Sequence, residues 1–260
     1  MMALRIYLLA GVNGGSGRSL TAALLAYGLH LQGRRTLLVR QTYAGSVAAI
    51  DPVGATLPVP CSSLMLQPPF ELTAGVSIRL AAAINQADAR FIIAVKHLAI
   101  AEVGADGDVV VDLCCHDRAC NRATMRGAAV IIVPVRTSVL EIDWAFRGFS
   151  HFRETQRKRS TPVPTLLAAI APDRERDPRR ALLDAMLRES DPERELMPAE
   201  PADLIEEVPF LDAAALTALL FERSIWQDPQ LMERCRAFAA AVAVHADAHV
   251  TRVTGDANDL

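Results

Sequence analysis

The fold is decided by residues 4–19, which read LRIYLLAGVNGGSGRS. Apart from Arg5, residues 4–10 form an apolar run with the length of a buried strand, and a cluster of glycines follows it directly. Residues 18–32 have the apolar period of a helix, Gly33 stands where its C-cap is expected, and 35–40 predict the next strand. The order strand, glycine loop, helix and strand predicts a parallel βαβ unit with a right-handed crossover.

The rest of the chain continues to alternate strands and helices. Further strands are predicted at 108–115, 128–135, 162–170 and 204–208. Further helices are predicted at 78–87, 117–126, 139–156, 178–188, 212–222 and 229–245. This alternation predicts a doubly wound α/β fold, with a mostly parallel sheet and helices on both faces.

Three segments are less regular. Residues 41–75 are rich in Pro, Gly and Ser, which predicts a long irregular connection with or without short strands. The apolar run 91–100 is either strand or helix, because a short run cannot be assigned by its period alone. We expect residues 1–246 to form a single P-loop NTPase-like domain and residues 247–260 to be a flexible tail.

Composition bounds the class of protein. The chain has 260 residues, of which 51% are hydrophobic and 22% charged, so it can bury a large core. Its apolar runs are shorter than the roughly 20 residues of a membrane span, so we expect no transmembrane segment, and the N-terminus lacks the features of a signal peptide. Five cysteines, with Cys114 and Cys115 adjacent, favour a reducing cytoplasm over a disulfide framework.

Charge limits the ways in which the chain could bind nucleic acid. A net charge of −3 supplies no global positive field, so DNA contact would have to come from a local patch. The candidate patch consists of Arg153, Arg157, Lys158 and Arg159. A solvated helix end explains the same four residues.

The glycine loop carries part of the chemistry of a phosphate-binding loop. Such a loop uses glycines to turn backbone N–H groups inward, a lysine for the β- and γ-phosphates, and Ser or Thr for magnesium. The residues expected to bind nucleotide are Asn13, Gly14, Gly15, Ser16, Gly17, Arg18, Ser19 and Leu20. The alternative is that the glycines only form a tight turn between strand and helix.

The loop resembles the deviant P-loop of the ParA/MinD family of ATPases, which reads Lys-Gly-Gly-x-Gly-Lys-Thr/Ser. The family's glycines and its magnesium-holding hydroxyl are matched by Gly14, Gly15, Gly17 and Ser19. Asn13 stands where the family has its signature lysine, and Arg18 where it has its phosphate lysine. Both lysines are therefore missing.

The resemblance extends from about residue 4 to residue 227. Arg40 stands where the family usually has an aspartate that prepares the attacking water. Residues 109–112 resemble its Walker-B-like strand, ending on Asp112. Residues 128–143 are especially similar to ParA relatives that serve plasmid partition and conjugative DNA transfer.

The resemblance implies a homodimer or a protein partner, and ATP or ADP as cofactor, with magnesium held by Ser19 and Asp112. Arg18 keeps the positive charge, but its planar guanidinium is bulkier than an ammonium group, so we expect weaker nucleotide binding. Asn13 removes a charge that hydrolysis uses, and Arg40 reverses another. We therefore predict a pseudo-ATPase, with ATP hydrolysis weak or lost, that acts by binding in positioning DNA or a cellular machine, and we assign no catalytic residue. The alternative is an active ATP hydrolase in which Arg18 replaces the P-loop lysine.

Two further candidates have alternative roles. Asp112 either binds magnesium through water or forms a hydrogen bond to Ser19 or to the backbone. Trp226 is either a core residue or part of an interface. The cluster of Cys114, Cys115, His116 and Cys120 invites a metal-site interpretation, but core packing of small thiols explains it better, because no second CxxC pair completes four ligands.

Overall fold

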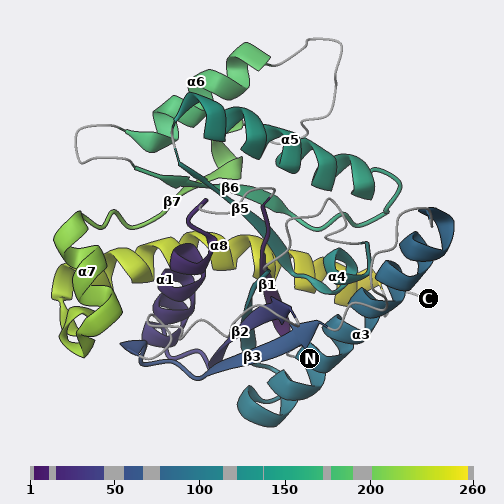
Figure 1. Cartoon of the computed structure of the whole chain (residues 1–260), viewed down its shortest axis with the longest axis horizontal. Helices are drawn as coiled ribbons and strands as arrows, with labels where there is room; N and C mark the ends of the chain where they lie inside the picture. The colour runs from purple at the N-terminus through teal and green to yellow at the C-terminus, as the bar shows by residue number, and fades with distance from the viewer. Residues whose placement is uncertain are drawn as a thin grey trace.

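The chain folds around one parallel sheet of seven strands with helices on both of its faces (Figure 1). This computed structural model describes residues 3–11, 16–43, 56–66, 77–113, 122–136, 138–171, 177–189 and 201–256. The strands are β1 (Arg5–Leu9), β2 (Thr36–Tyr43), β3 (Cys61–Leu66), β4 (Asp108–Asp112), β5 (Val130–Arg136), β6 (Thr165–Ile170) and β7 (Ile205–Glu207). Their order across the sheet is β3-β2-β4-β1-β5-β6-β7, and every pair is parallel. The predicted doubly wound α/β fold is confirmed.

The helices form two layers. The helices are α1 (Arg18–Leu31), α3 (Ser77–Val103), α4 (Arg122–Gly127), α5 (Val139–Gln156), α6 (Pro178–Glu189), α7 (Ala213–Phe221) and α8 (Pro229–Asp256), with short 3-10 turns η1 (Pro201–Leu204) and η2 (Arg223–Gln227). Buried residues of α1, α7 and α8 share one core with one face of the sheet, and those of α3, α4, α5 and α6 share the other. Alternate residues of β1 contribute to the two cores, since Ile6 and Leu8 face one layer while Tyr7 and Leu9 face the other.

The structure settles two open expectations, for residues 41–75 and 91–100, and it corrects the predicted ends of one strand and one helix. The region 41–75 contains a full parallel strand, β3, and β2 continues to Tyr43 instead of ending at residue 40. Residues 91–100 belong to the single 27-residue helix α3. The helix expected to end at residue 245 continues to Asp256, so residues 247–256 are helical instead of a frayed tail.

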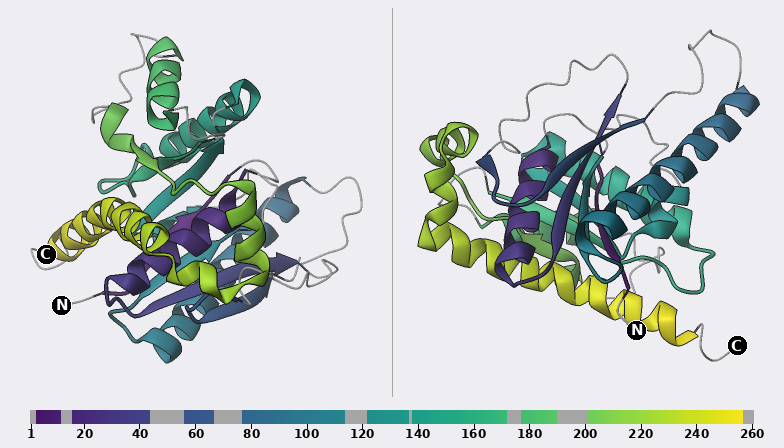
Figure 2. Two further views of the ribbon diagram at one scale, coloured as in Figure 1. Left: turned by 90° about the vertical axis from the view of Figure 1, so that its left-hand side faces the viewer. Right: turned by 90° about the horizontal axis from the view of Figure 1, so that it is seen from below.

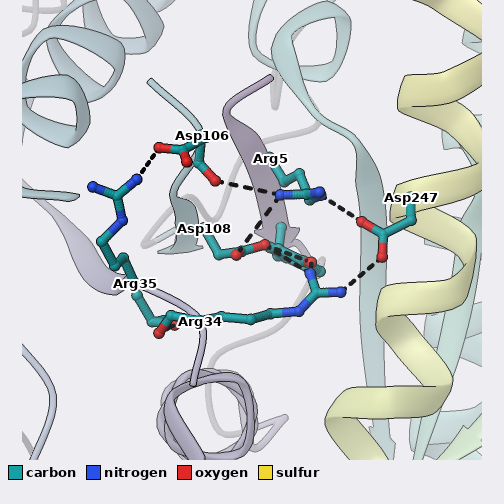
Figure 3. Close-up of polar contacts among 8 residues, drawn as sticks. Arg5, Arg34, Arg35, Asp106, Asp108 and Asp247 are labelled. Carbon is teal, nitrogen blue, oxygen red and sulfur yellow. Dashed lines mark hydrogen bonds and ion pairs between the residues drawn. The ribbon is translucent and has the colours of Figure 1, made fainter. Parts of the chain in front are cut away.

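An ion-pair network explains why α8 continues past residue 246. The Asp108 carboxylate accepts a hydrogen bond from the Tyr7 hydroxyl at 2.8 Å and one from the Arg34 guanidinium at 3.1 Å. The other Arg34 nitrogen donates to Asp247 of α8 at 2.7 Å, and Arg5 also pairs with Asp247 (Figure 3). Burial raises the pKa of Asp108, while Tyr7 and Arg34 oppose that rise. These contacts tie α8 to the N-terminal edge of the sheet.

Helices α1 and α8 lie side by side (Figure 2). They approach each other closely at Gly28. A Cβ atom at this position would lie 2.7 Å from the Ala239 Cβ and would overlap the Cys235 carbonyl oxygen. We expect Gly28→Ala to lower the free energy of unfolding by about 2–3 kcal/mol, because the two helices must move apart. Urea denaturation measures the loss. Gly255→Ala is the matched control, since nothing lies within 4 Å of a Cβ there; a loss of equal size at both positions would contradict the explanation.

His249 of α8 makes stability depend on pH. Its side chain is buried, and burial lowers its pKa from 6.5 to about 4, with Arg252 and Arg159 adding to the effect. As the pH falls from about 6.5 toward 4, His249 becomes protonated in the unfolded chain but stays neutral in the folded chain. The free energy of unfolding therefore falls by up to about 1.4 kcal/mol per pH unit. We expect His249→Gln to flatten this slope in urea titrations between pH 7 and pH 5. An unchanged slope would show that other groups cause the pH dependence.

Candidate functional site

The candidate site lies at the carboxyl edge of the sheet, where β1 leads into the glycine loop. Strand β1 lies between β4 and β5, and Gly11 follows it before the loop. Gly17 caps the start of α1 with φ of 85°, a left-handed conformation that favours glycine. Asn13, Gly14 and Gly15 lie outside the described residues, so their predicted contacts with nucleotide stay predictions.

Ser19 and Asp112 meet, as the resemblance implied. Ser19 stands in the first turn of α1 and Asp112 is the last residue of β4. The Ser19 hydroxyl donates a hydrogen bond to Oδ2 of Asp112 at 2.7 Å, and the Asp112 side chain is only 3% exposed. Of the two roles expected for Asp112, the structure shows the hydrogen bond to Ser19.

Arg40 shares the same carboxylate oxygen. Arg40 of β2 lies opposite Asp112 of β4 in the sheet register. Its Nε is 3.3 Å from Oδ2 of Asp112, and its side chain is 18% exposed. One largely buried carboxylate oxygen therefore contacts both a hydroxyl donor and a guanidinium cation. The charge at position 40 is visible in the sequence, whereas its pairing with Asp112 is not.

The other described loop residues have different surroundings. Nη1 of Arg18 donates a hydrogen bond to the Gly11 carbonyl at 3.2 Å, so the guanidinium contacts its own loop. The Ser16 hydroxyl is buried and makes no hydrogen bond within the described part of the chain. Leu20 is half-buried and packs against the core that contains α1. The predicted contacts of these three residues with nucleotide stay predictions.

The four cations of the candidate DNA patch lie at the end of α5 and just after it. Arg157 forms an ion pair with Glu154 at 3.6 Å, and Arg159 donates a hydrogen bond to Gln156 at 3.1 Å. The Arg153 guanidinium lies 5.4 Å from the centre of the Phe149 ring, and Lys158 is exposed. Intramolecular contacts thus engage three of the four cations, and DNA contact through this patch stays a prediction.

The remaining candidates are Trp226 and the cysteine cluster at residues 114–120. Trp226 is 2% exposed and belongs to the core, so its interface role is wrong. Cys114, Cys115, His116 and Cys120 lie outside the described residues. Within the ranges that the structure describes, no group of three or more His, Cys, Asp and Glu could hold a metal ion. Within the same ranges, no helix is both long and apolar enough to cross a membrane.

Known structures share this architecture. No protein-family model matches the sequence, and no curated protein matches it. McdA from Cyanothece, solved as a variant with ATP, matches with a TM-score of 0.52 at 13% identity, covering 94% of this chain and 98% of that one. A ParA family ATPase from Chlorobium tepidum matches with a TM-score of 0.52 at 13% identity, covering 92% and 99%. The pNOB8 ParA bound to nonspecific DNA matches with a TM-score of 0.53 at 14% identity, covering 94% and 99%.

The chain therefore has the α/β P-loop NTPase-like fold of ParA-family ATPases, over nearly the full length of each matched structure. This confirms the fold that the glycine loop and its resemblance implied.

Proposed function

We propose that this chain is a ParA/MinD-like cytoplasmic protein that works by binding, with ATP hydrolysis weak or lost. Its role would be to position DNA or a cellular machine, as a homodimer or with a protein partner. The observation that carries the proposal is the contact of Arg40 with Asp112, because it places a fixed cation where the fold family holds magnesium. The ParA-like fold supports the positioning role, and one protein with this fold was solved on nonspecific DNA.

Magnesium does not fit the residues present. Mg²⁺ needs oxygen ligands in near-octahedral geometry, and Oδ2 of Asp112 already contacts Ser19 and Arg40. Two unit positive charges about 4 Å apart repel each other by about 4 kcal/mol near a protein surface, and a divalent ion doubles that figure. The guanidinium therefore neutralises Asp112 and opposes a second cation at its side.

A nucleotide fits better than magnesium does. The buried Ser16 hydroxyl lacks a described partner, and a phosphate oxygen would accept its hydrogen bond. The N-terminus of α1 and the cations of Arg18 and Arg40 favour an anion at the same edge. Phosphoryl transfer, however, depends on metal and lysine charges placed around the transferred group. We infer weakened binding of ATP or ADP that serves regulation and not turnover.

The test is a calorimetric titration of the purified protein with ATP, once with magnesium and once with EDTA, followed by a phosphate-release assay. We expect magnesium to leave the affinity for ATP unchanged within about twofold, and phosphate release to stay at the level of a protein-free sample. Magnesium-dependent turnover that disappears in Arg18→Ala would overturn the proposal and establish the active ATPase.

A further inference from the structure

A second concave site lies at the far end of α1 from Ser19. An open pocket of about 620 Å³ is lined by the last turn of α1, residues 56–58, η2 and the start of α8. Because α1 has 14 residues, the pocket and the glycine loop are about 20 Å apart. The pocket is thus separate from the candidate nucleotide site, and its volume lies within the range of small-molecule sites.

The wall of the pocket is fixed by contacts within the protein. The Tyr27 and Trp226 rings meet edge to face with their centres 4.8 Å apart, and the Tyr27 hydroxyl donates a hydrogen bond to the Trp226 carbonyl. Nε1 of Trp226 donates to the Thr56 hydroxyl at 3.2 Å, and that hydroxyl donates to the Leu219 carbonyl at 2.7 Å. The polar atoms of this wall are paired with one another, so the surface offered to a ligand is largely apolar.

The lining has two kinds of side chain. Leu31, Leu57 and Met232 provide aliphatic surface. Arg223 and His30 are exposed and bring nitrogen donors to the same pocket, and no carboxylate belongs to its described lining. This combination is complementary to a molecule with an apolar body and one negative group. A guanidinium pairs with a carboxylate through two parallel hydrogen bonds.

We propose that this pocket binds an apolar carboxylate, with its hydrocarbon part against Leu31, Leu57 and Met232 and its carboxylate at Arg223. The proposal does not depend on whether the glycine loop binds or hydrolyses ATP. Its failure and that of the proposed function are therefore seen in separate experiments.

The chain contains a natural reporter for this site. It has two tryptophans, of which Trp226 lines the pocket and Trp144 is 48% exposed on α5. In a Trp144→Phe background all tryptophan fluorescence comes from Trp226. Decanoate serves as the probe, decanol as its uncharged counterpart and decylammonium as its positively charged counterpart, each kept monomeric as checked by light scattering. Decanoate with a bromine at its chain end tests whether the hydrocarbon reaches Trp226, because bromine quenches a nearby indole.

We expect saturable binding of decanoate, at least about tenfold tighter than that of decanol, and quenching by the brominated chain. Arg223→Gln is expected to reduce the affinity for decanoate to that for decanol, and the variant should fold because Arg223 is exposed. Arg252→Gln, an exposed arginine near the end of α8, is the matched control and should change nothing. Equal binding of decanoate and decanol, an unaffected Arg223→Gln variant, or no quenching by the brominated chain would each overturn the proposal.

Discussion

Asp108→Asn is expected to lower the free energy of unfolding by about 3 kcal/mol or more, the size found when one partner of a buried ion pair is removed. The Asp108 side chain is 3% exposed and receives hydrogen bonds from Tyr7 and Arg34, with Arg5 3.9 Å away. An asparagine keeps an acceptor for Tyr7 but leaves the cations of Arg34 and Arg5 with Asp247 alone. Urea denaturation at pH 7 measures the loss.

The same turn supplies the control for this prediction. Asp106 stands two residues earlier and pairs with Arg35, and their side chains are 39% and 59% exposed. Asp106→Asn is expected to cost less than about 1 kcal/mol, because water screens an exposed pair. If the two variants lost the same stability, burial of the network would not be the reason for its effect.

The parts of the fold that could be predicted are those with a strong local pattern. The run 4–10, the glycines and the helical period after Arg18 placed β1 and α1 within one residue of their observed ends. The position of strand β3 could not be predicted because it lies at the sheet edge, where Cys61 and Ser63 are exposed and the apolar pattern is weak. Edge strands of this kind are recognised by their partner and not by their own sequence.

Tertiary contacts determine the helical structure of residues 91–100 in α3 and of residues 247–256 in α8, which the local sequence does not predict. In α3 the buried residues Phe91, Val95 and Ala99 follow a helical period, but exposed Ile93 obscures it. In α8 the residues after Ala246 are polar enough to suggest fraying. Their order comes from the buried His249 and from the pairing of Asp247 across the sheet edge, which no local window contains.

The residues of the candidate site could be predicted from the sequence, but the contacts that depend on the order of the strands in the sheet could not. Ser19 and Asp112 could be paired from the resemblance, because loop and Walker-B-like strand meet in that family, and their hydrogen bond is observed. The contact of Arg40 with Asp112 requires β2 and β4 to be neighbours in register. The sequence predicts Arg40 at the end of one strand and Asp112 near the end of another, but it does not show that these two strands are neighbours. The contact of Arg40 with Asp112 could therefore be found only from the sheet topology.

Restoring the family's charges in the combined variant Asn13→Lys, Arg18→Lys, Arg40→Asp is expected to raise the rate of phosphate release by at least about a thousandfold over the wild-type chain. The reason is that single charges placed at the transferred phosphoryl group change turnover by about 10³ to 10⁵. Arg40→Asp also frees Oδ2 of Asp112 from its cation and adds a carboxylate beside it. A phosphate-release assay with saturating ATP and magnesium measures the gain.

Two further variants separate the steps in this restoration. Arg40→Asp alone is expected to tighten magnesium-dependent ATP binding by about tenfold or more, because it removes a repulsion of several kcal/mol, while turnover stays low without the lysines. Adding Asp112→Asn to the combined variant should abolish the restored hydrolysis, since the neutral amide removes the carboxylate that would hold magnesium together with Ser19. A combined variant that binds ATP with magnesium tightly yet turns it over no faster than the wild-type chain would show that the loss of activity lies elsewhere than in these three charges.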